Sequence, residues 1–146
     1  KARRVSGKGK VLIQTYNPDH SVFQLIKMND AAKTYDYFLK ERKKFHYPPY
    51  TKMIMLQLSH RKEDKITRAS QFMGSVLRKY LPEECVLGPE KSTVFKINNM
   101  FQFQILIKLP RGNKYASFKK LVLKSIEEFD EITAYHSIKK YLLIDF

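Results

Sequence analysis

Hydrophobic residues from position 51 to the end of the chain follow two different spacings. Alternating apolar and polar residues predict strands over 51–59, 91–97, 100–108 and 141–146. Apolar residues three or four positions apart predict two helices, one between Lys62 and Leu81 and one over 115–129. The order strand, helix, hairpin, helix, strand predicts an α+β domain, in which helices pack on one face of a mostly antiparallel sheet.

The strongest local signal in this pattern is a hairpin centred on Asn98-Asn99. Asparagine tolerates the positive φ angles that a two-residue hairpin turn requires. In the strand after the turn, apolar side chains that should face the core alternate with polar ones that should face away from it. The apolar set is Phe101, Phe103, Ile105 and Ile107, and the polar set is Gln102, Gln104 and Lys108.

The first fifty residues have a separate pattern. The apolar run Lys10–Tyr16 predicts a buried strand, and Asn17-Pro18-Asp19 then predicts a turn with a helix cap and a short helix. Asn29-Asp30 can cap a second helix with an apolar stripe, which Pro48-Pro49 cannot continue.

Composition adds a strong positive charge to this fold. The chain has 28 Lys and Arg residues against 14 Asp and Glu, a formal net charge of +14, so polyanions are the expected partners. No apolar stretch is long enough to predict a membrane-spanning helix, and a cytoplasmic location is the default expectation. The single cysteine, Cys85, excludes an internal disulfide or a multi-cysteine zinc site within the chain and is expected to be buried.

Candidate catalytic groups are scattered along the sequence. The four histidines have no second ligand at a metal-binding or triad spacing, and the segment Ser6–Lys10 lacks the phosphate-loop pattern and precedes a predicted strand. The adjacent carboxylate pairs Glu63-Asp64, Glu83-Glu84 and Glu127-Glu128 diverge from each other and are typical of solvated positions. We therefore expect no catalytic site, metal or cofactor in this chain by itself.

Basic residues gather in two places near the start of the chain, at positions 1–10 and at the end of the second predicted helix. Lys40, Arg42, Lys43 and Lys44 there can complement the helix dipole, or can contact phosphates together with the first cluster. One face of the predicted sheet would be polar and can either bind nucleic acid or simply be exposed to solvent. It would hold Gln57, Lys96, Gln102 and Gln104. An RNA recognition motif is disfavoured, because residues 101–105 lack its glycines.

Several segments, in this order, resemble the end of the bacterial primosomal replication-restart helicases, the primosomal protein N′ (PriA) family. They are Gly9-Lys10-Val11-Leu12-Ile13-Gln14-Thr15-Tyr16-Asn17-Pro18-Asp19-His20, Glu41-Arg42, Tyr47-Pro48-Pro49-Tyr50, Val86-Leu87-Gly88-Pro89, the run 101–108 and Leu143-Ile144-Asp145. The resemblance implies that residues 1–28 are the last strand and helix of the second helicase lobe. Residues 29–146 would be a C-terminal α+β domain similar to a small-subunit ribosomal protein.

The resemblance also implies a function. The parent protein would be an ATP-dependent 3′ to 5′ DNA helicase that restarts stalled replication forks in the bacterial cytoplasm, with ATP, Mg and Zn sites upstream of this chain. This chain would be a DNA-binding and docking module for forked or single-stranded DNA, for the upstream helicase lobes and for primosome proteins. The candidate DNA-binding residues are Lys8, Lys10, Arg42, Lys43, Lys44, Lys96, Asn98, Gln102 and Arg111.

Two alternatives share the same charge and fold. One is a free-standing ribosome-associated protein that binds RNA. The other is a protein-interaction module whose basic pockets receive the acidic tail of single-strand-binding protein.

Overall fold

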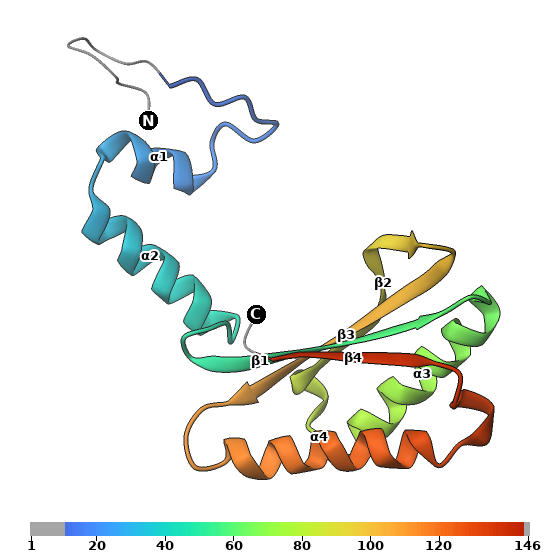
Figure 1. Cartoon of the computed structure of the whole chain (residues 1–146). Helices are drawn as coiled ribbons and strands as arrows, with labels where there is room; N and C mark the ends of the chain where they lie inside the picture. Colours follow the sequence, from blue (N-terminus) through green and yellow to red (C-terminus); the bar gives the residue numbers. More distant parts are fainter. Residues whose placement is uncertain (1–10, 145–146) are drawn as a thin grey trace, which may run out of the picture. The chain divides into compact units, whose positions relative to one another are not determined.

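A computed structural model of the chain describes residues 11–144. The chain divides into two compact units, Lys1–Lys40 and Glu41–Phe146 (Figure 1). Helix α2 (Ala31–Lys44) runs across this division. Because the two units are separate bodies, each is described by itself.

The second unit is a four-stranded antiparallel sheet with two long helices on one face (Figure 1). The strand order is β2-β3-β1-β4. The strands are β1 (Thr51–His60), β2 (Val86–Ile97), β3 (Met100–Pro110) and β4 (Lys139–Ile144), and the helices are α3 (Glu63–Tyr80) and α4 (Tyr115–Asp130). Single 3-10 turns, Glu83–Cys85 and Thr133–Tyr135, precede β2 and β4. The predicted α+β class and element order are confirmed.

The core lies between the sheet and the two helices, as the spacing of apolar residues predicts. Ile54, Leu56 and Leu58 of β1 have at most 1% of their surface exposed. Ile105 and Ile107 of β3 are likewise buried, facing Ile66, Met73 and Leu77 of α3 and Val122 and Phe129 of α4. Each such side chain contributes about 1.5–3 kcal/mol through burial, which fixes both helices to this face of the sheet.

The hairpin forms as predicted. Asn98 and Asn99 have φ angles of 49° and 59°, and Ile97 pairs with Met100 across the turn. Strand β2 begins at Val86 rather than at Lys91, because an irregularity between Leu87 and Glu90 lets it continue past Gly88-Pro89. Gly88 has a φ of +93°, and a Cβ there would lie 2.9 Å from the carbonyl oxygen of Gln104, so this close approach of the strands requires glycine.

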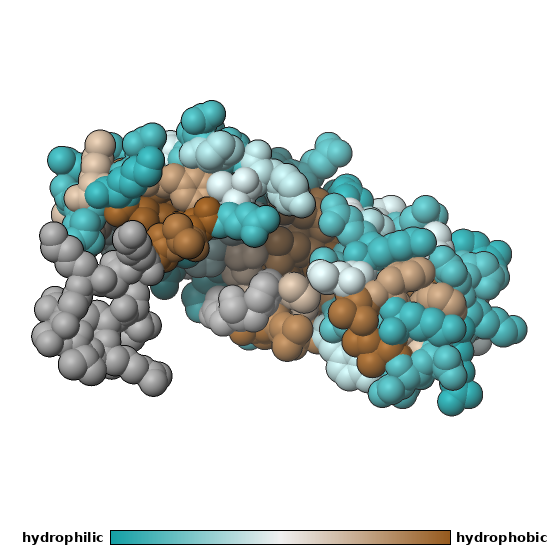
Figure 2. All heavy atoms as spheres, turned by 90° about the horizontal axis from the view of Figure 1, so that it is seen from above, coloured by the Kyte–Doolittle hydropathy of each residue, from teal (hydrophilic) through white to brown (hydrophobic). Residues whose placement is uncertain are grey.

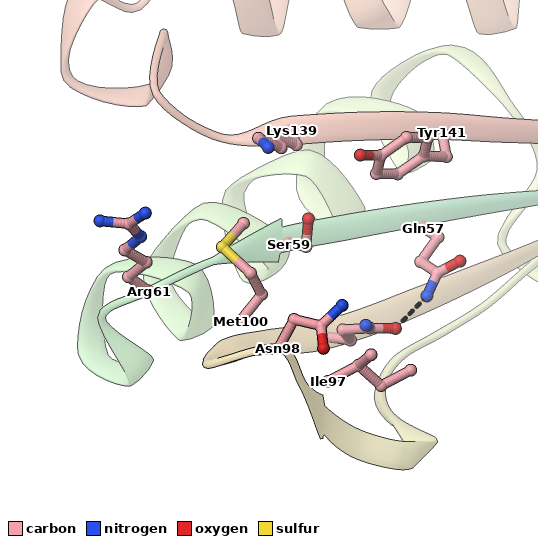
Figure 3. Close-up of a pocket in the computed structure, with 9 residues that line it drawn as sticks. Gln57, Ser59, Arg61, Ile97, Asn98, Met100, Lys139 and Tyr141 are labelled. Carbon is pink, nitrogen blue, oxygen red and sulfur yellow. Dashed lines mark hydrogen bonds between the residues drawn. The ribbon is translucent and has the colours of Figure 1, made fainter.

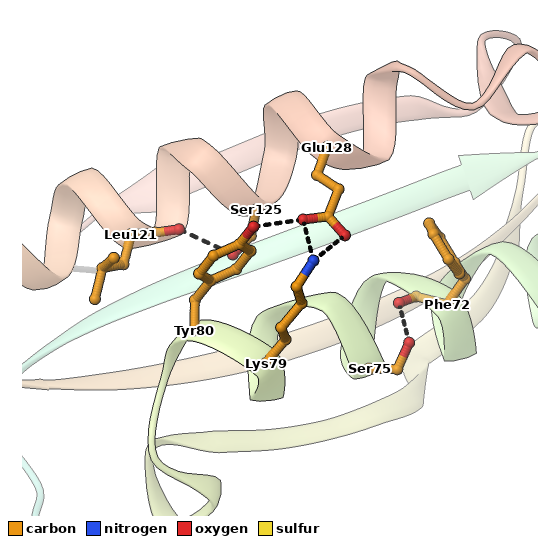
Figure 4. Close-up of polar contacts among 7 residues, drawn as sticks. All are labelled: Phe72, Ser75, Lys79, Tyr80, Leu121, Ser125 and Glu128. Carbon is orange, nitrogen blue, oxygen red and sulfur yellow. Dashed lines mark hydrogen bonds and ion pairs between the residues drawn. The ribbon is translucent and has the colours of Figure 1, made fainter.

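A polar cluster joins α3 to α4 on their exposed side (Figure 4). The Tyr80 hydroxyl donates to Glu128 at 2.6 Å, and Lys79 Nζ lies 2.9 Å from Glu128 Oε1. These hydrogen bonds, that of Tyr80 first and that of Lys79 second, hold the pKa of Glu128 below its ordinary value. The expectation that Glu127-Glu128 is merely solvated was wrong for Glu128, because the helix packing brings two donors to it.

Cys85 lies in the 3-10 turn before β2 and is only half-buried, so the prediction of a buried cysteine was wrong. Burial still raises the pKa of its thiol, followed by the effect of the neighbouring Glu84 charge. The turn places Val86, and not Cys85, in the core.

The first unit contains α1 (Ser21–Met28) and most of α2. Asp30 caps α2 as predicted, since its Oδ1 accepts from the amide of Lys33 at 3.0 Å. His20, not the predicted Asp19 turn, caps α1 through Nδ1 and the amide of Val22. Neither helix has a buried residue, so the predicted apolar stripe of α2 is not covered.

The strand predicted over Lys10–Tyr16 was wrong for the residues that the structure describes. Residues 11–16 form no strand, and Val11 and Leu12 are 72% and 95% exposed. A strand must pair its backbone groups with a neighbour, and no strand in the described range 11–144 pairs with this segment.

Candidate nucleic-acid interface

The face of the sheet opposite the helices carries two rows of polar side chains. Strand register places Ser59 between Gln102 of β3 and Lys139 of β4. In the adjacent row, Gln57 lies between Gln104 and Tyr141. Period-two alternation of β1, β3 and β4 puts both rows on this open face, because the buried Leu56 and Leu58 point to the helices.

These rows border an open hollow of about 500 Å³ at the hairpin end of the sheet (Figure 3). Its floor combines apolar groups from the hairpin with amides from the central strands. Gln57 Nε2 donates to Gln102 Oε1, so the two amides are joined at the centre. The nine lining residues are Gln57, Ser59, Arg61, Ile97, Asn98, Met100, Gln102, Lys139 and Tyr141.

The hollow is electropositive. Arg61 and Lys139 are both exposed, no acidic residue lines the hollow, and neither cation forms an ion pair with residues 11–144. Two uncompensated cations beside neutral donors and acceptors are suited to phosphate oxygens.

His60 holds the backbone near both cations. Its Nδ1 accepts from the amide of Lys62 at 3.0 Å, and its Nε2 lies 3.2 Å from the hydroxyl of Ser137. The first bond fixes the turn that carries Arg61, and the second ties this turn to the segment that leads into Lys139. The folded backbone therefore sets the separation of the two positions that carry these cations.

Figure 2 looks onto this open face and shows apolar surface bordered by hydrophilic side chains. Among the residues that the structure describes, no group of His, Cys, Asp and Glu could hold a metal ion. No described helix is both long and apolar enough to cross a bilayer. The residues that line the hollow offer positive charge, hydrogen-bonding groups and one aromatic ring.

A comparison with known protein families identifies the family of this chain. The family model described as "Primosomal protein N C-terminal domain" matches residues 43–138. The chain belongs to this family.

Individual relatives of this primosomal family agree. The chain is 31% identical to "Replication restart protein PriA" of Synechocystis over 84% of its length, and 27% identical to that of Bacillus subtilis over 85%. It spans only 14% and 16% of those two proteins. Among solved structures, the designed protein Foldit4 aligns with 66% of this chain and 97% of its own at a TM-score of 0.44 and 11% identity.

In this member of the primosomal protein N family, the nine predicted DNA-binding residues lie in several places. Asn98 and Gln102 line the hollow together. Lys96 lies one residue before the lining residue Ile97, but its ammonium is 4.8 Å from the ring of Phe101, whose side chain packs against the core. Lys8 and Lys10 lie outside the described residues.

The remaining predicted cations lie around the corner 45–49, where α2 meets β1. Arg42 donates to the carbonyl of Pro48 at 2.9 Å, and Arg111 donates to that of Pro49 at 2.7 Å. Lys108, which was not among the predicted residues, donates to the carbonyl of Phe45 at 2.8 Å in the same corner. These side chains satisfy backbone acceptors in a turn, which gives Arg42 and Arg111 a structural use that their sequence positions did not reveal.

Lys43 and Lys44 are exposed at the end of α2, and the Lys44 ammonium lies 5.4 Å from the ring of Phe45. Neither residue lines the hollow.

Sequence reasoning missed Ser59, Arg61, Lys139 and Tyr141. The alternation of Lys139, Tyr141 and Leu143 with their neighbours does place these three on one face of a strand. Their position beside Gln57 and Ser59, however, depends on the register of β4 against β1, which no local pattern specifies.

Proposed function

We propose that this chain is the DNA-contacting module of a replication-restart DNA helicase and that the hollow on the open sheet face is its contact surface. The observation that carries the proposal is the pair of cations Arg61 and Lys139, which form no ion pair within residues 11–144 and lie in a hollow that no described acidic residue lines. Relatives named replication restart proteins support DNA as the polyanion.

The mechanism is electrostatic positioning. Arg61 and Lys139 neutralise phosphates of the backbone, and the side chains of Asn98 and Gln102 offer hydrogen bonds without reading the sequence. Because few cations take part, affinity is weak and falls as salt rises.

The wider proposal concerns the longer protein. ATP-dependent 3′ to 5′ unwinding, with ATP, Mg and Zn, would belong to upstream parts, and forked DNA would reach this module from there. Docking on the helicase lobes, single-strand-binding protein or other primosome proteins in the bacterial cytoplasm is part of the same proposal.

The test compares two matched double variants of this chain. Arg61→Ala with Lys139→Ala removes both cations of the hollow, whereas Lys119→Ala with Lys120→Ala removes two exposed lysines from α4, on the other face of the sheet. Anisotropy of a fluorescent single-stranded oligonucleotide is measured over a series of salt concentrations. The first variant should bind more weakly and flatten the slope of log K against log salt by about 1.4, since each phosphate contact on a single strand contributes about 0.7.

The control variant should retain most of the slope. Equal slopes for the two variants would contradict the proposed surface. An acidic-tail peptide could instead displace the fluorescent oligonucleotide more strongly than unlabelled DNA does. If this displacement is lost in the first variant, the result favours the protein-interaction alternative.

A further inference from the structure

We infer that the hollow accepts one unpaired base of single-stranded nucleic acid, stacked on Tyr141 and hydrogen-bonded to the amides of Gln57 and Gln102. This inference rests on the proposed function and adds the class of ligand. It means that the module distinguishes single strands from duplexes by their bases, in addition to contacting phosphates.

Tyr141 is the first reason. It lies on β4, an edge strand, and is 53% exposed on the open face. Within residues 11–144 its ring stacks on no other ring and lies under no cation, and its hydroxyl makes no hydrogen bond. An aromatic ring held by a strand and left without a partner is a stacking platform of the kind that sequence-tolerant single-strand binders use.

The joined amides are the second reason. Gln57 pairs in register with Tyr141, so the two residues are neighbours on adjacent strands, and the Gln57 amide reaches toward Gln102 on the other side. The Gln57–Gln102 hydrogen bond uses one donor and one acceptor, which leaves Gln57 Oε1 to accept and Gln102 Nε2 to donate toward the hollow. Adjacent donor and acceptor groups match the Watson–Crick edge of a base, and that edge is free only when the base is unpaired.

The size and polarity of the hollow are the third reason. About 500 Å³ is within the range of pockets that hold small organic groups, and Ile97 and Met100 give it an apolar wall. In Figure 3, Arg61 lies at one end, beyond Ser59, and Tyr141 lies at the other end, beside Gln57. A nucleotide can then stack its base on the ring, with the edge of the base toward the amides, while the neighbouring phosphates meet the cations.

A duplex has no base available for this arrangement. Its bases are paired and stacked inside the helix, and only its phosphates can reach Arg61 and Lys139. At equal length and equal salt concentration, single strands should therefore bind more tightly than duplexes. The difference in affinity should come from stacking on Tyr141.

The experiment uses three ligands of equal length: a single-stranded oligonucleotide, an abasic oligonucleotide with the same phosphates, and a duplex. Three forms of the chain are compared with the wild type, namely Tyr141→Ala, Tyr141→Phe and the control Tyr35→Ala, which alters an exposed tyrosine on α2. Circular dichroism and thermal melting establish that each variant is folded.

The wild type should bind the base-bearing strand about tenfold more tightly than the abasic strand. Tyr141→Ala should erase this ratio while leaving affinity for the abasic strand unchanged. Tyr141→Phe keeps the ring and should retain most of the ratio, and Tyr35→Ala should retain all of it. A fourth variant, Gln57→Ala, should lower the ratio in part.

Equal affinity of the wild type for base-bearing and abasic strands would overturn the inference. So would a ratio that survives in Tyr141→Ala. Either result leaves the proposed function intact if the Arg61 and Lys139 double variant still weakens binding to both strands, whereas an unchanged affinity of that double variant refutes the proposed function itself.

Discussion

Replacing Phe129 with alanine should destabilise the sheet unit more than a truncation at an exposed position of the same helix. Phe129 lies on α4 and is fully buried. Its ring centroid is 5.2 Å from that of Tyr135, with the rings stacked at 12°, and 6.1 Å from that of Phe72 on α3. One side chain thus joins α3, α4 and the turn that leads into β4.

The size of the effect follows from these contacts. Truncating a buried phenylalanine to alanine costs about 3–5 kcal/mol, because burial is lost and a cavity remains. Phe129→Leu keeps most of the volume and loses the two ring contacts, so it should cost about 1–2 kcal/mol. Leu123→Ala removes a 45%-exposed side chain of α4 and should cost less than about 1 kcal/mol.

Chemical denaturation followed by far-ultraviolet circular dichroism gives the free energy of unfolding for each variant. The loss of unfolding free energy should be largest for Phe129→Ala, smaller for Phe129→Leu and smallest for Leu123→Ala. Phe129→Ala should lower Tm by at least about 10 °C. A cost below about 1 kcal/mol for Phe129→Ala would refute the packing of α4 against α3 and the sheet.

Three further outcomes can be checked by thermal melting. Asn99→Gly should keep the Tm of the wild type and Asn99→Val should lower it, because the φ of 59° suits glycine and strains a β-branched residue; equal values would argue against the two-residue turn. Arg42→Ala should lower the free energy of unfolding by about 1 kcal/mol, because the hydrogen bond to the Pro48 carbonyl is lost, and Lys43→Ala should lower it by less than about 0.5 kcal/mol. A larger loss for Lys43→Ala than for Arg42→Ala would contradict the structural role of Arg42 in the corner 45–49. Glu128→Gln should lower stability at neutral pH. Because the folded pKa of Glu128 lies below its ordinary 4.5, the difference from the wild type should shrink as pH falls through the folded pKa, and a difference that persists in acid would exclude this origin.

Sequence patterns predicted the sheet unit well because its signals are local. The two-residue turn needs only Asn98 and Asn99, and the buried sides of β1 and α3 follow from periods of two and 3.6 residues. The start of β2 could not be predicted, since Gly88-Pro89 usually ends a strand and here occupies an irregularity within one.

The same patterns failed where structure depends on a partner. Residues 11–16 have the composition of a buried strand, but composition does not provide the neighbouring strand that pairs with it. Asn98 and Gln102 line the hollow and were already candidate DNA-binding residues in the sequence, because both belong to the hairpin. Arg61, Lys139 and Tyr141 were missed because tertiary register brings them to it, and charge alone drew attention to Arg42 and Arg111, which bind backbone carbonyls.

Because β4 lies at the sheet edge, ligand binding at the hollow depends on the pairing of β4 with β1. Seven of the nine lining residues come from β1, the turn after it and the β2–β3 hairpin, and two come from β4, so the hollow is complete only after the most sequence-distant pairing of the described strands has formed. A ligand that contacts both β4 and the rest of the hollow binds only when β4 is paired with β1. By mass action, such a ligand must therefore oppose the separation of β4 from β1. Amide exchange along β4 should then slow as ligand occupancy rises, whereas exchange in α4, on the other face of the sheet, should stay unchanged.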